Sequence, residues 1–217
     1  MKTLNWKFRS RSIKLDSSAF TLIEMLGVVA IIALITAAVA PMVFGTLVAT
    51  KLSSAGQTMS AAISLGHELA VAESHDVEVR FYSYTEADEP GSKGAYRAII
   101  LVNPPSTLTG DGIQMGEIIR LPSGIIIGDS STLSPLLSST SITSSSDKEK
   151  FIRSSTAKYK AFRFRPDGTT SLASVEANKC YFTLGEERLL SDESRVPANF
   201  YAIQSDPLSG RASSYRP

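Results

Sequence analysis

One acidic side chain, Glu24, stands at the start of a long apolar stretch and is the residue best placed for electrostatic work. From Met25 to Thr50 the sequence contains no charged residue. A carboxylate in such a stretch is costly to remove from water, and it attracts a cation strongly where the dielectric constant is low. The chemistry indicated is pairing with a positive group. The alternative interpretation is a carboxylate that reaches back toward lipid headgroups.

Other residues capable of chemistry do not form a catalytic or metal-binding pattern. His67 and His75 have no partnering cysteine or close pair of acids in the sequence, and a metal needs more ligands. The single cysteine, Cys180, excludes an intramolecular disulfide and has no activating sequence neighbour. The loop acids lack the spacing of a calcium loop; they are Asp88, Glu89, Asp111 and Asp129. Phosphate loops and nucleophile elbows are absent from the sequence, so we expect no enzyme activity, no metal and no cofactor.

The sequence around Glu24 predicts a membrane anchor. Residues 1–19 form a cationic leader, and the apolar stretch over residues 20–48 exceeds the ~20 residues that a helix needs to cross a bilayer. By the positive-inside rule the leader stays in the cytosol and the rest is exported. A secretory signal peptide cleaved after Ala38-Val39-Ala40, before Pro41, is the alternative. The stretch is, however, longer than the ~7–15 residues of a usual signal core.

The leader and the sequence Phe20-Thr21-Leu22-Ile23-Glu24 resemble the prepilin signal of type IV pilins and of type II secretion pseudopilins. The resemblance implies that a prepilin peptidase cuts between Ala19 and Phe20 and methylates the amino group of Phe20. Ala19 departs from the family's usual glycine. The resemblance also implies that Glu24 meets the amino terminus of a neighbouring subunit during assembly, and that Pro41 stands where the family commonly has a proline.

Beyond the apolar stretch the helical pattern continues and becomes amphipathic. Steps of four and three residues run through Val48, Leu52, Ala55, Met59, Ala62, Gly66 and Leu69. This spacing predicts one long helix over residues 20–74, with a transmembrane half over 20–48 and a half that packs on a domain. Pro41 predicts a kink, because it clashes with the carbonyl of Ala37; a hydroxyl such as that of Thr36 would then satisfy the freed group. The proline is either a tolerated membrane proline or a weak point at which the helix bends in a filament.

Residues 75–217 predict a β-rich globular domain. Alternating apolar and polar residues from Val77 to Tyr82 indicate a half-buried strand. Further strands are expected at residues 96–102, 117–121, 125–127, 180–184 and 200–204, the second and third as a pair. Residues 129–147, rich in Ser and Thr, predict a surface loop that buries little. Residues 206–217 indicate a turn and an exposed end.

A second recognisable block begins with a strand over residues 159–164. Phe162 and Phe164 point to one side and Arg163 and Arg165 to the other. Solvated charge is the default interpretation of the two arginines, and an acidic partner is the alternative. Pro166-Asp167-Gly168 predicts a tight turn with residues 169–175 returning as the second arm of a hairpin. The expected fold class is therefore α+β, a long N-terminal helix on an antiparallel sheet.

Three blocks, residues 77–82, 162–169 and 199–217, resemble the Verru_Chthon cassette protein D family, and the domain is similar to the minor pseudopilin H of type II secretion. The resemblance implies a pilin-like filament subunit in the inner membrane, with a cytosolic N-terminus and a periplasmic or extracellular domain. Its implied partners are the prepilin peptidase, other pilin or pseudopilin subunits, an assembly platform and lipid. The near-neutral net charge of +1 gives no sign of nucleic-acid binding. The alternative is a signal-anchored exported binding module that never polymerises.

Overall fold

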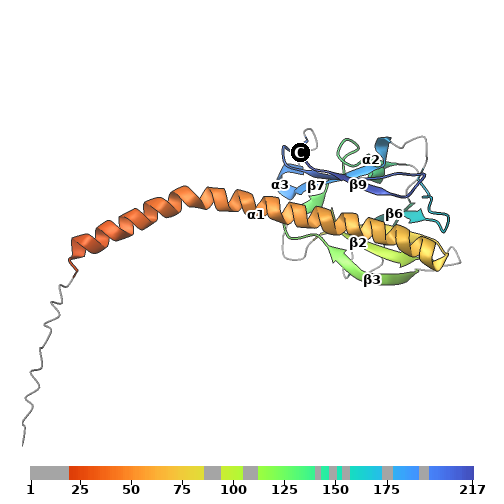
Figure 1. Ribbon diagram of the computed structural model, residues 1–217, viewed down its shortest axis with the longest axis horizontal. Coiled ribbons are helices and arrows are strands. Elements are labelled where there is room, and N and C mark those ends of the chain that lie inside the picture. The colour runs from red at the N-terminus through yellow and green to blue at the C-terminus, as the bar shows by residue number, and fades with distance from the viewer. Residues whose placement is uncertain are drawn as a thin grey trace, which may run out of the picture. The chain divides into compact units, whose positions relative to one another are not determined.

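The computed structural model describes residues 20–85, 94–104, 112–139, 143–146, 151–152, 157–172, 178–190 and 196–217, without the side chains of residues 40–44 and 143–146. The chain divides into two compact units, Met1–Phe44 and Gly45–Pro217. Helix α1 (Leu22–Glu73) belongs to both (Figure 1). The second unit also contains β1 (Val77–Tyr84), β2 (Ala95–Asn103), β3 (Ile113–Arg120), β4 (Ile125–Ile127), α2 (Pro135–Ser138), β5 (Thr143–Ser146), β6 (Lys158–Phe164), β7 (Tyr181–Glu186), α3 (Glu187–Leu190), β8 (Tyr201–Ser205) and β9 (Ala212–Tyr215).

The strands form one antiparallel sheet. Within the described residues its order is β5-β6-β1-β2-β4-β7-β8-β9, and β3 pairs with β2 as a branch. The prediction of an N-terminal apolar helix combined with an antiparallel sheet is confirmed. The prediction that residues 117–121 and 125–127 pair with each other is wrong, because β3 and β4 each pair with β2 instead.

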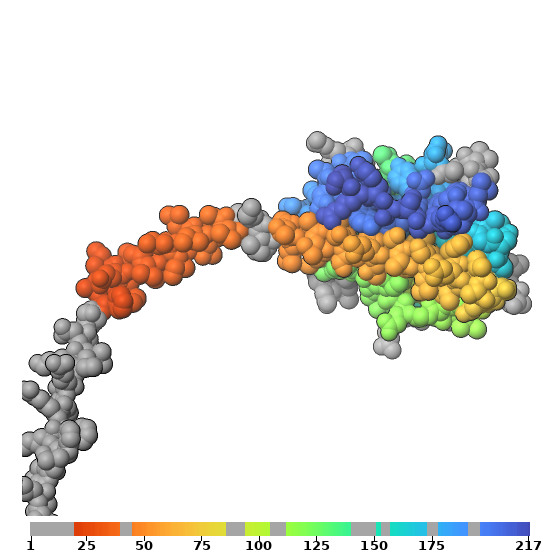
Figure 2. Space-filling model, in the orientation of Figure 1, coloured from red at the N-terminus to blue at the C-terminus, as the bar shows by residue number. Residues whose placement is uncertain are grey.

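The second half of α1 contributes to the main core of its unit. Figure 2 shows this half, coloured orange to yellow, between the green strands that follow it and the blue C-terminal strands. Leu52, Met59 and Ile63 are each at most 1% exposed and belong to the same apolar cluster as strand residues of the sheet. Two glycines permit the close approach. A Cβ at Gly56 would lie 2.4 Å from the ring of Tyr201, and one at Gly66 would lie 3.1 Å from Leu101.

Gly56→Ala is expected to destabilise the domain by about 1–3 kcal/mol, because the Tyr201 ring must move out of its packed position. This loss exceeds the gain of about 1 kcal/mol that alanine brings to a helix interior. Gly45→Ala is the matched control, since a Cβ at this helical glycine meets nothing within 4 Å. Urea unfolding of the detergent-solubilised protein measures both. Equal midpoints for the two variants would contradict the close contact at Gly56.

The prediction that β1 is half-buried is wrong, because both of its faces are covered. Val77, Val79 and Phe81 face the main core. The other face belongs to a second cluster that includes Tyr82, Tyr84, Ala98, Ile100, Val102, Ile152 and Ala157. The cover comes partly from Phe151, Ile152 and Ala157, which are far from β1 in sequence. As a result, Glu78 and Arg80 are each only 4% exposed.

The expectation that residues 129–147 form a surface loop that buries little is also wrong for its described part. This segment contains α2 and β5, and its leucines pack inward: Leu133, Leu136 and Leu137 are at most 2% exposed. The hydroxyl of Ser134 accepts a hydrogen bond from the backbone N–H of Thr183 in β7 at 3.1 Å. The burial of three leucines therefore determines the position of this segment, although its mostly polar composition predicts a surface loop.

The Pro166-Asp167-Gly168 turn forms as predicted. Gly168 has a φ of 82°, and the N–H of Arg165 donates to the carbonyl of Thr169 at 2.8 Å. The hydroxyl and then the backbone N–H of Thr169 hold the pKa of Asp167 below its usual range. The returning arm is shorter than predicted in its described part, where Thr170 makes a single bridge to Phe164. Residues 173–175 lie outside the described residues.

Candidate membrane and assembly segment

The first half of α1 exposes its apolar side chains in every direction. Among the described residues, one helical segment, Leu22–Val39, is long and apolar enough to cross a membrane, and none of it is buried. Leu22, Ile23 and Leu34 are 84%, 76% and 74% exposed. A helix that is apolar all round requires lipid or other helices as its surroundings. The segment is consistent with a single-pass anchor or with a signal sequence.

Glu24 lies in the first turn of α1 and closes a capping box with Thr21. One carboxylate oxygen, Oε2, accepts hydrogen bonds from the backbone N–H of Thr21 at 2.9 Å and from its hydroxyl at 2.7 Å. The Thr21 hydroxyl accepts in turn from the N–H of Glu24 at 3.3 Å. The carbonyl of Thr21 accepts the bond from Met25, so Thr21 is the N-cap. These reciprocal bonds satisfy donors that a helix start otherwise leaves unpaired.

The structure describes some of the other residues of the processing and assembly hypothesis. Phe20 directly precedes the capping box and is 73% exposed. Ala19 lies outside the described residues. Pro41 falls within the bounds of α1, but its side chain is not described, so the kink stays a prediction. The hydroxyl of Thr36 donates to the carbonyl of Ile32 at 2.8 Å, so the expectation that it serves the carbonyl of Ala37 is wrong.

His67 packs where two turns from distant parts of the chain meet. Its ring lies edge-on to Phe164 with the centroids 5.6 Å apart. A Cβ at Gly168 would lie 3.3 Å from Nε2 of His67, and one at Gly210 would lie 2.4 Å from its Cδ2. Both glycines have positive φ. The hydroxyl of Thr170 also donates to the carbonyl of Pro207, joining the two turns. His67 therefore serves packing.

His75 is engaged separately, at the end of α1. Its Nδ1 lies 2.9 Å from the carbonyl of Asp76, and its Nε2 lies 2.7 Å from the carboxylate of Glu73. The bond to the Asp76 carbonyl and then the charge and bond of Glu73 raise the pKa of His75. The described residues contain no group of three metal-ligating side chains, and Cys180 is buried.

Of the four candidate calcium ligands, the described residues include Asp129. Asp88, Glu89 and Asp111 lie outside the described residues. Asp129, the remaining one, has its Oδ1 3.8 Å from Nζ of Lys160, and its side chain is 61% exposed. An ammonium group so close to the carboxylate competes with a metal cation there.

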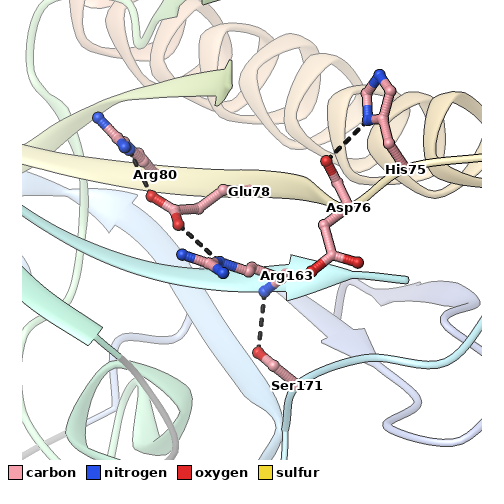
Figure 3. Close-up of polar contacts among 6 residues, drawn as sticks. All are labelled: His75, Asp76, Glu78, Arg80, Arg163 and Ser171. Atoms are coloured by element: carbon pink, nitrogen blue, oxygen red, sulfur yellow. Dashed lines mark hydrogen bonds and ion pairs between the residues drawn. The ribbon is translucent and has the colours of Figure 1, made fainter. Parts of the chain in front are cut away.

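A buried charged cluster, missed by the sequence analysis, lies on the second face of the sheet (Figure 3). Glu78, whose side chain is 5% exposed, accepts from Nε of Arg80 at 2.6 Å and from Nε of Arg163 at 2.9 Å. We call these three residues the Glu78 triad. The guanidinium of Arg80 also lies over the ring of Tyr159 at 4.4 Å. Burial works against the charged form of Arg80, but the bond and charge of Glu78 outweigh it and raise the pKa of Arg80.

The triad gives Arg163 a partner within its own chain. Arg163 lies opposite Glu78 in the register between β6 and β1, and its backbone N–H donates to the hydroxyl of Ser171 at 2.9 Å. The side chain of Arg163 is 43% exposed, whereas that of Arg80 is 5% exposed. The triad thus fastens β1 to β6, a structural role. The sequence contains Glu78 and Arg163 in two predicted strands, and a prediction that these strands pair would have indicated the contact.

Comparison with known proteins identifies no family for this chain. No protein-family model, curated protein or solved structure matches the chain. The function is therefore inferred from the residues themselves, and the segment from Phe20 to Val39 is the part of the molecule that most constrains it.

Proposed function

We propose that this chain is a structural subunit, a minor pilin or pseudopilin, of a filament like a type IV pilus or a type II secretion pseudopilus. The observation that carries the proposal is the contrast within α1. Its residues 22–39 are exposed and apolar, with one acid in the first turn, whereas Leu52 and Met59 are buried in a folded domain. One helix thus combines an exposed apolar half, which requires lipid or other helices around it, with a half that packs in the core of a domain.

Membrane lipid surrounds the first half of α1 before assembly, and the helices of neighbouring subunits replace lipid in the filament. A prepilin peptidase cuts between Ala19 and Phe20, which leaves a positive amino group on Phe20. The carboxylate of Glu24 pairs with the amino group of a neighbouring subunit, because opposite charges attract strongly where the dielectric constant is low. The capping box supports this role, since it holds the carboxylate at the helix start. The chain acts on no substrate.

The decisive measurement for processing is the intact mass and N-terminal sequence of protein extracted from membranes. The expected product begins with an N-methylated Phe20. A chain that begins at Pro41 would instead identify a cleaved secretory signal. A chain that retains residues 1–19 and stays solitary in the bilayer would favour the signal-anchored binding module.

A further inference from the structure

The end of the domain at which α1 enters carries a group of apolar, aromatic and basic side chains. We call this group the collar; it consists of Leu47, Lys51, Phe200, Tyr215 and Arg216. The guanidinium of Arg216 donates to the carbonyl of Ala49 in α1 at 3.2 Å, which ties the residue after β9 to the helix. The rings of Phe200 and Tyr215 lie 6.0 Å apart. The collar therefore joins α1 to the last two strands of the sheet.

Most of the collar is open to solvent. Leu47 is 51% exposed and Tyr215 is 61% exposed, and Lys51 and Arg216 are also exposed. Lys51 lies two residues after Ala49, whose carbonyl accepts from Arg216, so both cations belong to the same short stretch of α1. Aromatic rings beside lysine and arginine are the side chains that favour a membrane–water interface.

The length of the apolar stretch matches the thickness of a bilayer, so the residues that directly follow it in sequence are expected near the headgroups. Helix from Leu22 to Val48 rises about 40 Å, which matches the ~40–45 Å thickness of a bilayer with its headgroups. Lys51 is the first charged residue after this stretch. Farther along α1, the last turns contain Glu68 and Glu73, and the final turn has no basic residue.

We propose that the collar binds the headgroups of anionic phospholipids, so that the domain rests on the bilayer surface before the subunit is extracted. The inference rests on the membrane anchoring in the proposed function. Lys51 and Arg216 contact lipid phosphates, while Tyr215 and Leu47 lie at the boundary with the acyl chains. A polar, negatively charged membrane surface attracts such residues near a spanning helix, and the attraction falls within a Debye length.

The test places a single tryptophan at chosen positions of the full-length protein, after Trp6, the chain's one tryptophan, has been replaced by Phe. Tyr215→Trp reports on the collar. Leu208→Trp is the matched control, because Leu208 is 67% exposed in the turn that follows β8. Leu34→Trp reports on anchoring. The protein is reconstituted in phosphatidylcholine vesicles brominated in the upper acyl chain, with and without phosphatidylglycerol, and fluorescence quenching is measured.

We expect strong quenching at position 34 in both lipids and quenching at position 215 that increases with phosphatidylglycerol and exceeds that at position 208 severalfold. Lys51→Glu with Arg216→Glu should reduce the signal at 215 to the level of 208, whereas Arg211→Glu in the turn should not. Equal quenching at 215 and 208, with position 34 quenched, overturns the collar and leaves anchoring intact. If quenching at position 215 depends on the protein-to-lipid ratio and not on phosphatidylglycerol, the collar contacts a second copy of the chain and the lipid proposal is wrong. Absence of quenching at 34 removes the anchor and with it the proposed function.

Discussion

Glu24→Gln is expected to leave the protein in the membrane but to lower its incorporation into filaments at least about tenfold, since ~1.4 kcal/mol of lost attraction changes an equilibrium tenfold. Glutamine at the third helical position still completes a capping box, because its amide oxygen accepts the bonds from Thr21. The substitution therefore removes the charge and keeps the cap. Recovery of the tagged variant in sheared filament preparations, normalised to its amount in membranes, measures incorporation.

Two further variants separate the roles of cap and charge. Glu24→Ala removes both and should fail to incorporate, whereas Thr21→Val removes the hydroxyl that Glu24 contacts and keeps the carboxylate. Incorporation of Thr21→Val close to the wild-type level is the expected result. If Glu24→Gln assembled normally while Glu24→Ala did not, Glu24 would act through the helix cap and the pairing with a neighbouring amino group would be wrong.

Glu78→Gln is expected to lower the free energy of unfolding of the domain by about 3–5 kcal/mol, the usual cost of leaving a buried charge without its counter-ion. The charge left behind is that of Arg80, whose side chain is 5% exposed and whose Nε lies 2.6 Å from Glu78. Guanidinium cannot avoid the cost by losing its proton in the accessible pH range. Chemical denaturation of the full-length protein in detergent, followed by circular dichroism, measures the loss.

Two controls locate this effect in the interior. Arg163→Gln should cost clearly less than Glu78→Gln, because the side chain of Arg163 is 43% exposed and water can replace it. Glu78→Leu combined with Arg80→Met should recover most of the stability, because a well-packed apolar pair is often neutral or better than a buried ion pair. A double variant as unstable as Glu78→Gln would show that shape and not charge limits this site.

Local patterns in the sequence predicted the parts of the fold that depend on local physics. The helical stripe marks residues that are buried, among them Leu52 and Met59. The Pro-Asp-Gly turn forms because Gly168 accepts a positive φ. Thr21 and Glu24 have the Thr-x-x-Glu spacing of a capping box, so this contact was also predictable from the sequence. The two interpretations given for Glu24, an assembly charge and a carboxylate that reaches toward headgroups, both leave the cap out.

Features that depend on distant segments were missed. The alternation of apolar and polar residues in β1 predicts that its polar side faces solvent. In the structure, Ile152 and Ala157 cover that side. The turn and the exposed end predicted for the C-terminal residues are confirmed, but the pairing of β9 with β8 over Ala212–Tyr215 was not predicted. A distant segment that packs over a strand, or pairs with it, leaves no periodic pattern in the sequence of that strand. The assembly role of Glu24 is harder still, because it depends on a second molecule.

The sharing of α1 between the two units limits how this protein can be shortened. A fragment that starts after Glu73 would lack Leu52, Met59 and Ile63, and the sheet would expose the apolar face that they cover. A fragment that starts at residue 45 lacks the exposed apolar half of α1 and retains every side chain that α1 contributes to the main core. The boundary for a water-soluble, foldable version of the domain therefore lies inside the helix, not at its end.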